Sequence, residues 1–251
     1  SATGVKVGSL SNPFLTVQAA INSILDASST KVYVVMVLPG RYLENLTFKP
    51  WVNIVGTTKE ATVIATGSAG THTGTFTTGG RISFKDLALG GSNQNIVFNH
   101  PAGSPNGTSI TFDNVNLGTP TFNMLGGGVD YVQLRNDFYC FGKATIHSAN
   151  TTACNGTFMG GILVDDVGAE HLDTYGSASS NTIKDCVGAE LNCVGNVWTE
   201  FYNNYSWDKL ISNGAQCTVS YDAQSAPDSP ANLQSLNGGQ FQRTDNAFAI
   251  G

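Results

Sequence analysis

The sequence predicts an all-β fold of the solenoid type, a parallel β-helix in which short strands follow one another around a common axis. Residues 32–56 hold three short apolar strands with a turn signal between each pair. Strand-length runs then recur with glycine or asparagine between them, and two of these runs repeat each other 28 residues apart. Periods between about 20 and 50 residues are typical of solenoids.

The first coil begins with a nearly continuous apolar run. Val32–Leu38 is rich in β-branched residues, which is the pattern of a strand shielded on both faces. Pro39-Gly40 then forces a turn, because proline fixes φ and glycine accepts positive φ. Asn45–Phe48 and Val52–Val55 alternate apolar with polar residues, as half-buried strands do. The chain therefore turns two corners within one coil.

A degenerate repeat continues the pattern. Ile82–Gly90 and Ile110–Gly118 each consist of an alternating strand, a tight corner and a second short strand. The corners fall at Asp86 and Asn114, and Asn136 occupies the same place in the next coil. Asn tolerates the left-handed region and its amide can hydrogen-bond from coil to coil, so we expect these residues to be structural.

Period-two alternation around each corner predicts the residues that point into the solenoid. We expect ladders of stacked apolar side chains, one rung for each coil, because neighbouring coils place equivalent positions side by side. The predicted inward residues are Val32, Val34, Ile54, Ile82, Phe84, Ile110 and Phe112.

The opening of the chain resembles a known family. Thr16–Ile21 and the turn Pro39-Gly-Arg-Tyr-Leu-Glu-Asn45 resemble the start of pectin-lyase-like proteins, in which an amphipathic helix caps the first coil and a Pro-Gly-x-Tyr-x-Glu-Asn turn follows the first strand. The resemblance covers residues 14–57, and beyond them it is only compositional. It implies a single-stranded right-handed parallel β-helix with a short N-terminal capping helix, and a history of contact with polysaccharide. It implies no single activity, since the fold hosts lyases, esterases, hydrolases and inert virion spikes.

Length and local composition predict one domain with two appendages. At 251 residues the chain suits one solenoid, which we place at residues 32–222 behind an N-terminal cap at 1–31. Asp222–Pro230 breaks the strand pattern, so residues 223–251 are expected to form a linker and tail. The tail has too few apolar residues for its own core and must pack on the solenoid or on a neighbour. The first residue is Ser1, without an initiator Met or signal sequence, so we expect a processed or trimmed product.

The composition argues against several classes of partner and favours an extracellular location. Only 12% of residues are charged, and the net charge of −6 is spread along the chain without a Lys/Arg cluster, so no nucleic-acid partner is expected. The same charge does not favour an anionic polysaccharide. No apolar run approaches the ~20 residues of a membrane span. A surface of hydroxyls and amides is common in secreted and virion proteins, which predicts an extracellular or virion-surface location.

The densest group of ionisable residues lies around two similar segments. Asp166–Glu170 and Cys186–Glu190 lie 20 residues apart, which would stack Glu170 and Glu190 about 4.8 Å from each other. Stacked carboxylates raise one another's pKa, which would suit a general acid or a calcium site. The alternative is a solvated edge partly neutralised by Lys184. The other members are Asp165, His171, Asp173 and Asp185.

No catalytic, metal or cofactor residue is assigned. Gly127–Tyr131 faintly resembles the aspartate strand of the family's esterases, but the companion glutamines and the arginine are missing. The histidines have no metal-ligand spacing, and no phosphate or dinucleotide loop is present. Of the five cysteines, Cys186 and Cys193 are expected to be small buried residues, while a bridge between Cys140 and Cys154 remains open.

Aromatic residues cluster in residues 197–207. They could stack on sugar rings, as carbohydrate-binding surfaces do. They could equally form an apolar patch that closes the end of the solenoid or meets another subunit. The candidate carbohydrate or subunit contacts are Trp198, Phe201, Tyr202, Tyr205 and Trp207.

These observations favour a non-catalytic structural protein of an extracellular particle, such as a virion spike, fibre or capsid-surface component. We expect it to be a homo-oligomer, with a trimer favoured, and to have a host-surface glycan as a candidate ligand. One alternative is a secreted polysaccharide-active enzyme, a lyase, esterase or glycoside hydrolase, that uses the carboxylates around Asp166 and Glu170. The other is a carbohydrate-binding adhesin that uses the aromatic cluster.

Overall fold

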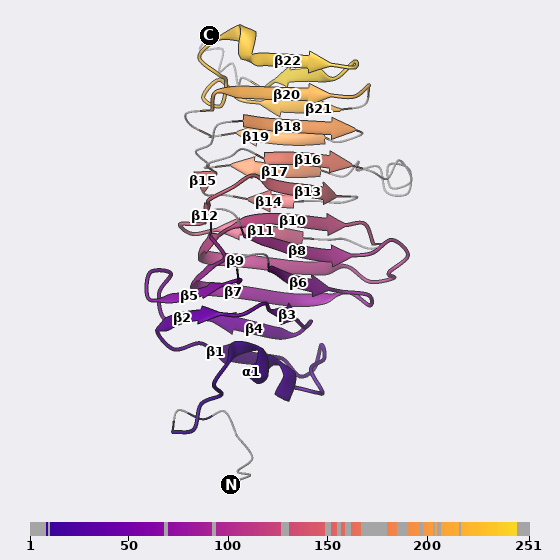
Figure 1. Ribbon diagram of the computed structural model, residues 1–251. Coiled ribbons are helices and arrows are strands. Elements are labelled where there is room, and N and C mark those ends of the chain that lie inside the picture. Colours follow the sequence, from indigo (N-terminus) through magenta and orange to yellow (C-terminus); the bar gives the residue numbers. More distant parts are fainter. Residues whose placement is uncertain are drawn as a thin grey trace, which may run out of the picture.

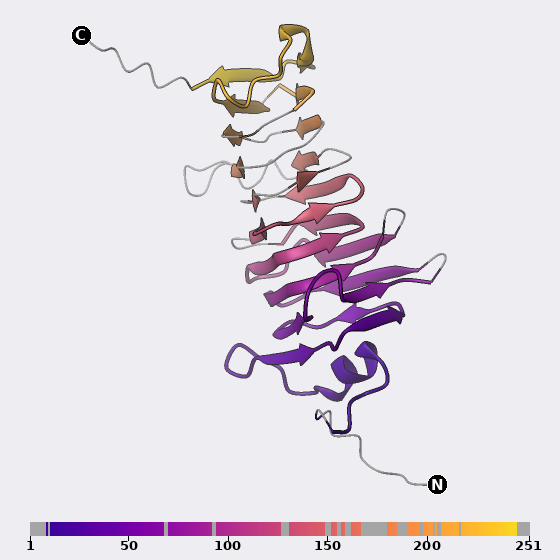
Figure 2. The same cartoon turned by 90° about the vertical axis from the view of Figure 1, so that its left-hand side faces the viewer.

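The computed structural model shows an elongated stack of strands with the two chain ends at opposite ends of the stack (Figures 1 and 2). Strand pairs between successive coils are parallel, and the described residues include one short α-helix at the N-terminal end. The prediction of an all-β parallel β-helix with an N-terminal helix is therefore confirmed. The structure describes residues 9, 11–67, 70–91, 94–126, 131–148, 152–154, 157–158, 162–166, 180–184, 190–195, 198–202, 204, 207–215 and 217–244.

Two parallel sheets run the length of the stack. The main path of the 14-stranded sheet is β1 (Tyr33–Met36), β4 (Val52–Val55), β7 (Gly80–Leu89), β9 (Thr108–Leu117), β11 (Tyr131–Arg135), β14 (Thr152–Cys154), β17 (Ser180–Lys184), β19 (Trp198–Tyr202), β21 (Thr218–Tyr221) and β23 (Gln240–Arg243). Beside this path lie β2 (Gly40–Leu43), β5 (Thr62–Ala65), β12 (Tyr139–Cys140) and β15 (Thr157–Phe158). The 9-stranded sheet is β3 (Thr47–Phe48), β6 (Thr71–Thr75), β8 (Asn95–His100), β10 (Thr119–Met124), β13 (Ala144–Ser148), β16 (Ile162–Asp166), β18 (Glu190–Gly195), β20 (Lys209–Asn213) and β22 (Leu233–Leu236).

The corners of the coils are left-handed residues, as predicted. Asp86 within β7, Asn114 within β9 and Asn136 after β11 have φ values of 53°, 55° and 52°. The Asn114 side-chain amide donates to Asp86 Oδ1 at 2.7 Å, and that of Asn136 donates to Asp113 Oδ1 at 2.9 Å. The corner side chains therefore tie each coil to the one before it, which is why short polar residues occupy these positions.

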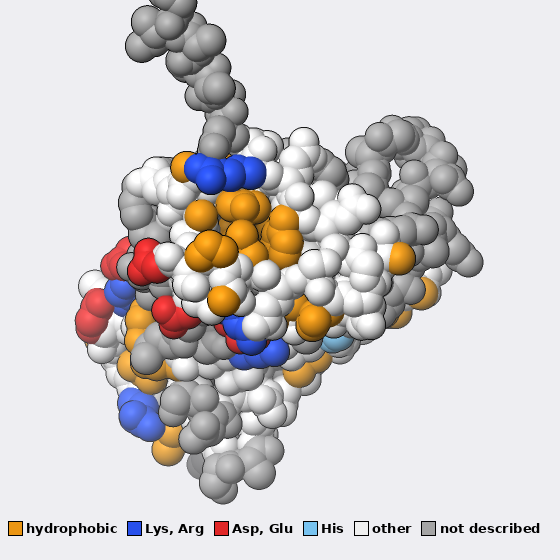
Figure 3. Space-filling view, turned by 90° about the horizontal axis from the view of Figure 1, so that it is seen from above, with side chains coloured by type: hydrophobic (Ala, Val, Ile, Leu, Met, Phe, Trp, Pro, Cys, Tyr) orange, Lys and Arg blue, Asp and Glu red, His pale blue; other side chains and the backbone are white. Residues whose placement is uncertain are grey.

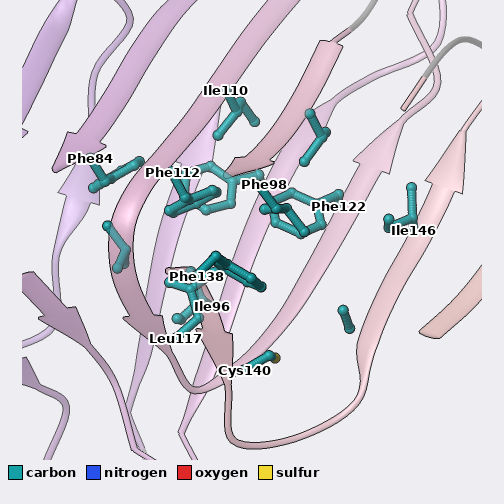
Figure 4. Packing of buried hydrophobic residues seen from close by; sticks show 14 of the residues in the cluster. Phe84, Ile96, Phe98, Ile110, Phe112, Leu117, Phe122, Phe138, Cys140 and Ile146 are labelled. Atoms are coloured by element: carbon teal, nitrogen blue, oxygen red, sulfur yellow. The ribbon is translucent and has the colours of Figure 1, made fainter. Parts of the chain in front are cut away.

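Stacked aromatic rings fill the centre of the solenoid (Figure 4). Phe112 lies 4.9 Å from Phe84 between ring centroids, with the rings nearly parallel, and 5.8 Å and 5.9 Å from Phe98 and Phe122. All four rings are fully buried. The predicted burial is confirmed for Ile54, Ile82, Phe84, Ile110 and Phe112.

The prediction is wrong for the two inward residues expected in the first apolar run. Val32 and Val34 are 51% and 58% exposed, whereas Val35 and Val37 are buried. An uninterrupted apolar run carries no alternation that would mark the inward face, and here its outer face is not covered by any described residue. The exposed aliphatic side chains of the cap and first coil are Leu15, Leu25, Val32, Val34, Met36, Leu38 and Leu43.

A short helix covers the N-terminal end of the core. In α1 (Val17–Ser23), Val17 and Ile21 are buried, and the Thr16 hydroxyl caps the first turn by accepting from a backbone N–H. The Glu44 carboxylate accepts from two backbone N–H groups of the first turn, at 2.8 Å each. At the other end, the Lys49 ammonium donates to two backbone carbonyls at 3.1 Å and 3.0 Å. A negative charge at the N-terminus and a positive charge at the C-terminus of α1 both interact favourably with the helix dipole. The first coil therefore stabilises the cap.

Strands continue beyond residue 222, where the sequence had suggested a linker. After a 3₁₀ turn at Pro230–Asn232, β22 and β23 pair in parallel with β20 and β21 and extend both sheets. Phe241 packs on Tyr221, with ring centroids 6.1 Å apart. Figure 3 looks onto this end, where apolar side chains gather in a patch. Backbone pairing with a preformed rung thus compensates for the few apolar residues of this segment.

Candidate functional site

A surface groove of about 640 Å³ lies where strands of the main sheet begin. This volume is within the range of small-molecule and cofactor sites. The groove runs along the starts of β4, β7, β9 and β11, and the loop before β1 also contributes to its lining. It is lined by Ala27, Ser28, Ser29, Trp51, Thr78, Gly79, Gly80, Arg81, Asn106, Gly107, Thr108, Ser109 and Tyr131.

The repeat places four of these residues on consecutive rungs. Arg81 pairs with Ser109, and Ser109 pairs with Tyr131. The Trp51 N–H donates to the carbonyl oxygen of Arg81 at 2.6 Å, so Trp51 lies one rung earlier. With about 4.8 Å per rung, the backbone positions of Trp51 and Tyr131 are about 14 Å apart. The groove therefore has one aromatic residue at each end, with Arg81 and Ser109 between them.

The backbone at Trp51 is held in an unusual conformation. Its φ is +66°, and for a bulky residue a positive φ is a genuine outlier. The neighbouring coils hold it there: besides the bond to Arg81, the Trp51 carbonyl accepts from Tyr33 N–H at 2.9 Å. Backbone strain of this kind is often found at functional sites, so the Trp51 indole is a candidate binding group.

Two glycines form the floor of the groove. A Cβ at Gly79, where φ is +74°, would lie 2.7 Å from the carbonyl oxygens of Asn106 and Gly107. A Cβ at Gly80 would lie 2.7 Å from Pro50. The Asn106 amide also donates to Thr78 O at 3.1 Å, which joins the two loops. The loops can approach this closely only because position 79 lacks a side chain.

The lining offers polar groups that are free to meet a ligand. Within the described part of the chain, the Arg81 guanidinium is exposed and makes no ion pair, and the Tyr131 hydroxyl and the Trp51 indole N–H make no hydrogen bond. Among the described residues that line the groove there is no Asp, Glu, His or Cys. The described lining residues can therefore donate hydrogen bonds and stack on rings, and Tyr131 is the one among them of a type that often serves in acid–base catalysis.

The expected stacking of Glu170 on Glu190 involves Glu170, which lies outside the described residues, so only the register of the neighbouring strands is described. β16 pairs with β18 so that Ile162 is opposite Leu191 and Asp166 is opposite Gly195, an offset of 29 residues rather than 20. Glu190 begins β18, so it lies at the opposite end of the strand pair from Asp166. Its carboxylate is 3.7 Å from Lys209 Nζ. Between β16 and β18 the chain forms β17 of the other sheet. The offset between paired residues therefore exceeds the 20-residue spacing of the sequence repeat. Glu170, His171, Asp173 and Asp185 lie outside the described residues, and only the backbone of Asp165 and Lys184 is described.

The aromatic cluster is largely internal. Phe201 is fully buried and Trp207 is 5% exposed, with their ring centroids 4.8 Å apart in an edge-on arrangement. Neither ring can stack on a sugar from solvent, because both fill the core between β19 and β20. Tyr202 points outward and is 37% exposed. Tyr205 lies outside the described residues, and for Trp198 only its place in β19 is described.

The buried histidines are core residues. His72 has no exposed surface, its Nδ1 accepts from Leu46 N–H at 3.2 Å, and its ring lies 6.1 Å from Phe48. Burial lowers the pKa of His72 to about 4, so its ring is neutral at physiological pH. His100 is also fully buried. Within the described residues, no three His, Cys, Asp or Glu side chains are grouped as metal ligands.

The described thiols are also internal. Cys140, Cys193 and Cys217 are buried free cysteines, which confirms the expected role of Cys193 and leaves Cys140 unbridged to Cys154. Burial raises the pKa of the Cys140 thiol to about 12, so this group is unreactive. Cys186 lies outside the described residues.

Comparison with known proteins adds no relative. A scan of protein-family models, a search of curated proteins and a search of solved structures each return no match. The fold class therefore rests on the strand pairing itself. In the part of the chain that the structure describes, no helix combines the length and apolar character needed to cross a bilayer.

The groove residues were not singled out from the sequence, although a signal for them exists. Trp51, Arg81, Ser109 and Tyr131 each directly precede an inward residue of the repeat, namely Val52, Ile82, Ile110 and Val132. Aligning the coils on their inward residues would have placed these four side by side. The aromatic density of residues 197–207 is the more conspicuous signal in the sequence, but two of its rings, Phe201 and Trp207, belong to the core.

Proposed function

We propose that this protein is a non-catalytic structural component of an extracellular particle, of the pectin-lyase-like virion spike or fibre kind, and that it binds a glycan in the Trp51–Tyr131 groove. The observation that supports the glycan site is a groove with an aromatic residue at each end and uncommitted hydrogen-bonding groups between them. A sugar ring presents an apolar face and a rim of hydroxyls, so it matches both kinds of group.

The spacing of the groove suits an extended oligosaccharide. The backbone positions of Trp51 and Tyr131 are separated by about 14 Å, which is long enough for a chain of sugars rather than for one ring. The Ser109 hydroxyl and Asn106 Oδ1 lie in the same lining and can bond to sugar hydroxyls. The rigid backbone around Trp51 lowers the entropy lost on binding, since the groove is already formed.

The lining also favours binding over catalysis. Glycoside hydrolysis uses two carboxyl groups that flank the scissile bond, and lyases and esterases of this fold also depend on acidic residues. The described residues of the groove lining include no acidic residue, and of the predicted acidic group the described Glu190 pairs with Lys209. A secreted polysaccharide-active enzyme is therefore the less favoured proposal.

The test is binding to a glycan array followed by titration of the best oligosaccharide. Trp51→Asn removes the indole while keeping a residue that tolerates positive φ, and it is expected to weaken binding about tenfold or more. Tyr202→Ala is the matched control, because that ring is exposed on β19 outside the groove. Equal affinity of Trp51→Asn and the unmodified protein would refute the site. Shortened glycan products would replace the proposal with the enzyme.

We further propose that the protein is a homo-oligomer, with the sequence favouring a trimer. The exposed aliphatic side chains of the N-terminal end support this proposal, whereas Phe201 and Trp207 of the aromatic cluster are buried. The aliphatic side chains are uncharged and present on every copy, so a closed rotation axis can place them against their counterparts. Light scattering should give about three times the chain mass of 26.3 kDa. Val34→Lys with Met36→Lys should give a monomer, whereas Leu236→Lys at the other end should not.

A further inference from the structure

We infer that the groove selects a glycan carrying an isolated oxyanion, a carboxylate or a sulfate, and that Arg81 is the residue that recognises it. This inference rests on the proposed glycan-binding function and adds the chemical class of the ligand. It is independent of whether the protein belongs to a virion or to another extracellular particle.

Arg81 makes no ion pair with a described residue, as is also true of Arg41, Lys85 and Lys143, but among these cations it is the one in the groove lining. Lys31 pairs with Asp26, Lys59 with Asp137, and Lys209 with Glu190. The Lys49 ammonium is bound to backbone carbonyls of the N-terminal cap. Further along β7, Lys85 lies opposite Asp113 in the strand register. Arg81 is exposed in the groove, and the lining residues that the structure describes include no carboxylate.

The position of Arg81 fits a substituent on a bound sugar chain. It lies one rung, about 4.8 Å, from Trp51 and two rungs, about 10 Å, from Tyr131. A sugar stacked on Trp51 would thus place a group of the next unit beside the guanidinium. The guanidinium fork matches carboxylate and sulfate oxygens with two parallel hydrogen bonds. Discrimination by such charge-assisted bonds exceeds that of a hydroxyl–hydroxyl contact.

The charge of the whole chain limits the number of anionic units. The net charge of −6 opposes a polymer with an anion on every sugar, as composition had suggested. Beyond about 8 Å at physiological ionic strength, however, exposed charges are largely screened. A single anionic group bound at Arg81 is attracted by the guanidinium. It avoids the repulsion by acidic side chains that the further charges of a polyanion would experience along the surface.

The experiment is isothermal titration at physiological salt with one oligosaccharide backbone in four forms: neutral, with one carboxylate, with one sulfate, and with a carboxylate on every unit. The unmodified protein should bind a singly charged form about tenfold or more tightly than the neutral form, and more tightly than the polyanion. The carboxylate and sulfate arms decide which oxyanion is preferred. Arg81→Gln should remove the preference by bringing the affinity for the singly charged forms down to that for the neutral form. Lys85→Gln removes the same charge outside the groove and should keep the preference.

Three results would overturn the inference while leaving the proposed function intact. The neutral and singly charged forms could bind equally in a Trp51-dependent manner. Arg81→Gln could weaken all forms alike, which would indicate a structural role. Lys85→Gln could remove as much preference as Arg81→Gln, which would indicate overall charge alone. Absence of binding to every form, charged or neutral, would instead refute the proposed function and the inference with it.

Discussion

Phe112→Ala tests the aromatic ladder of the core most severely. Phe112 is fully buried, and its ring contacts Phe84, Phe98 and Phe122 at centroid distances of 4.9 to 5.9 Å. Truncating a buried Phe to Ala costs about 3–5 kcal/mol through lost burial and the cavity that remains. Three neighbouring rings lose a partner at once, each contact contributing about 0.5–1.5 kcal/mol, and paired backbone strands cannot collapse into the space. We therefore expect a loss near the upper end, about 4–5 kcal/mol.

The assay is urea unfolding followed by circular dichroism, with the free energy of unfolding compared at equal slope. Phe141→Ala is the matched control, because Phe141 is the same residue type but 38% exposed and outside the core cluster. Its truncation should cost about 1 kcal/mol or less. Equal losses for the two variants would refute the ladder as the source of stability. A partial unfolding step confined to the variant would indicate that the coils unfold separately, as solenoid repeats can.

The remaining predictions concern a buried histidine, the helix cap and the groove floor. The pKa of His72 is about 4 when folded and 6.5 in its ordinary state, so between these values only the unfolded chain binds the proton. Stability is therefore lost as the pH falls through 6.5 towards 4, by about 2 kcal/mol at about pH 5, and urea unfolding of His72→Gln should lack this component. Glu44→Gln should cost about 1–2 kcal/mol in the same assay by weakening two charge-assisted bonds to α1, whereas Glu60→Gln at an exposed site should not. Gly79→Ala should lower stability by about 1–3 kcal/mol because of its positive φ and the close carbonyls, while Gly67→Ala, which has open space, should leave the melting temperature unchanged.

The fold was predictable because its strongest signals are local and repeated. Left-handed corners need Asn or Asp, and inward positions such as Phe84 and Phe112 recur at the same place in each coil. These features depend on residues close in sequence, which periodicity detects. The N-terminal cap was predictable for the same reason, since a helix and a Pro-Gly turn follow each other within one coil.

Errors arose where a feature depends on what covers a strand or on coil length. Val34 lies in a run that looks shielded on both faces, but β1 is the first rung and its outer face stays exposed. The offset of 29 residues between β16 and β18 could not be read from a 20-residue sequence repeat, because loops of variable length separate the coils. Trp207 was expected on the surface because apolar rings serve cores and binding sites alike. The site was missed because its residues are 22 to 30 positions apart.

The most direct test of the proposed function is a crystal structure with the highest-affinity oligosaccharide from the array. The account predicts an intact glycan along the groove, with one sugar stacked on Trp51, another near Tyr131, and an anionic group within hydrogen-bonding distance of the Arg81 guanidinium. A glycan bound elsewhere, such as over Tyr202 on β19, or a cleaved product in the groove would contradict it.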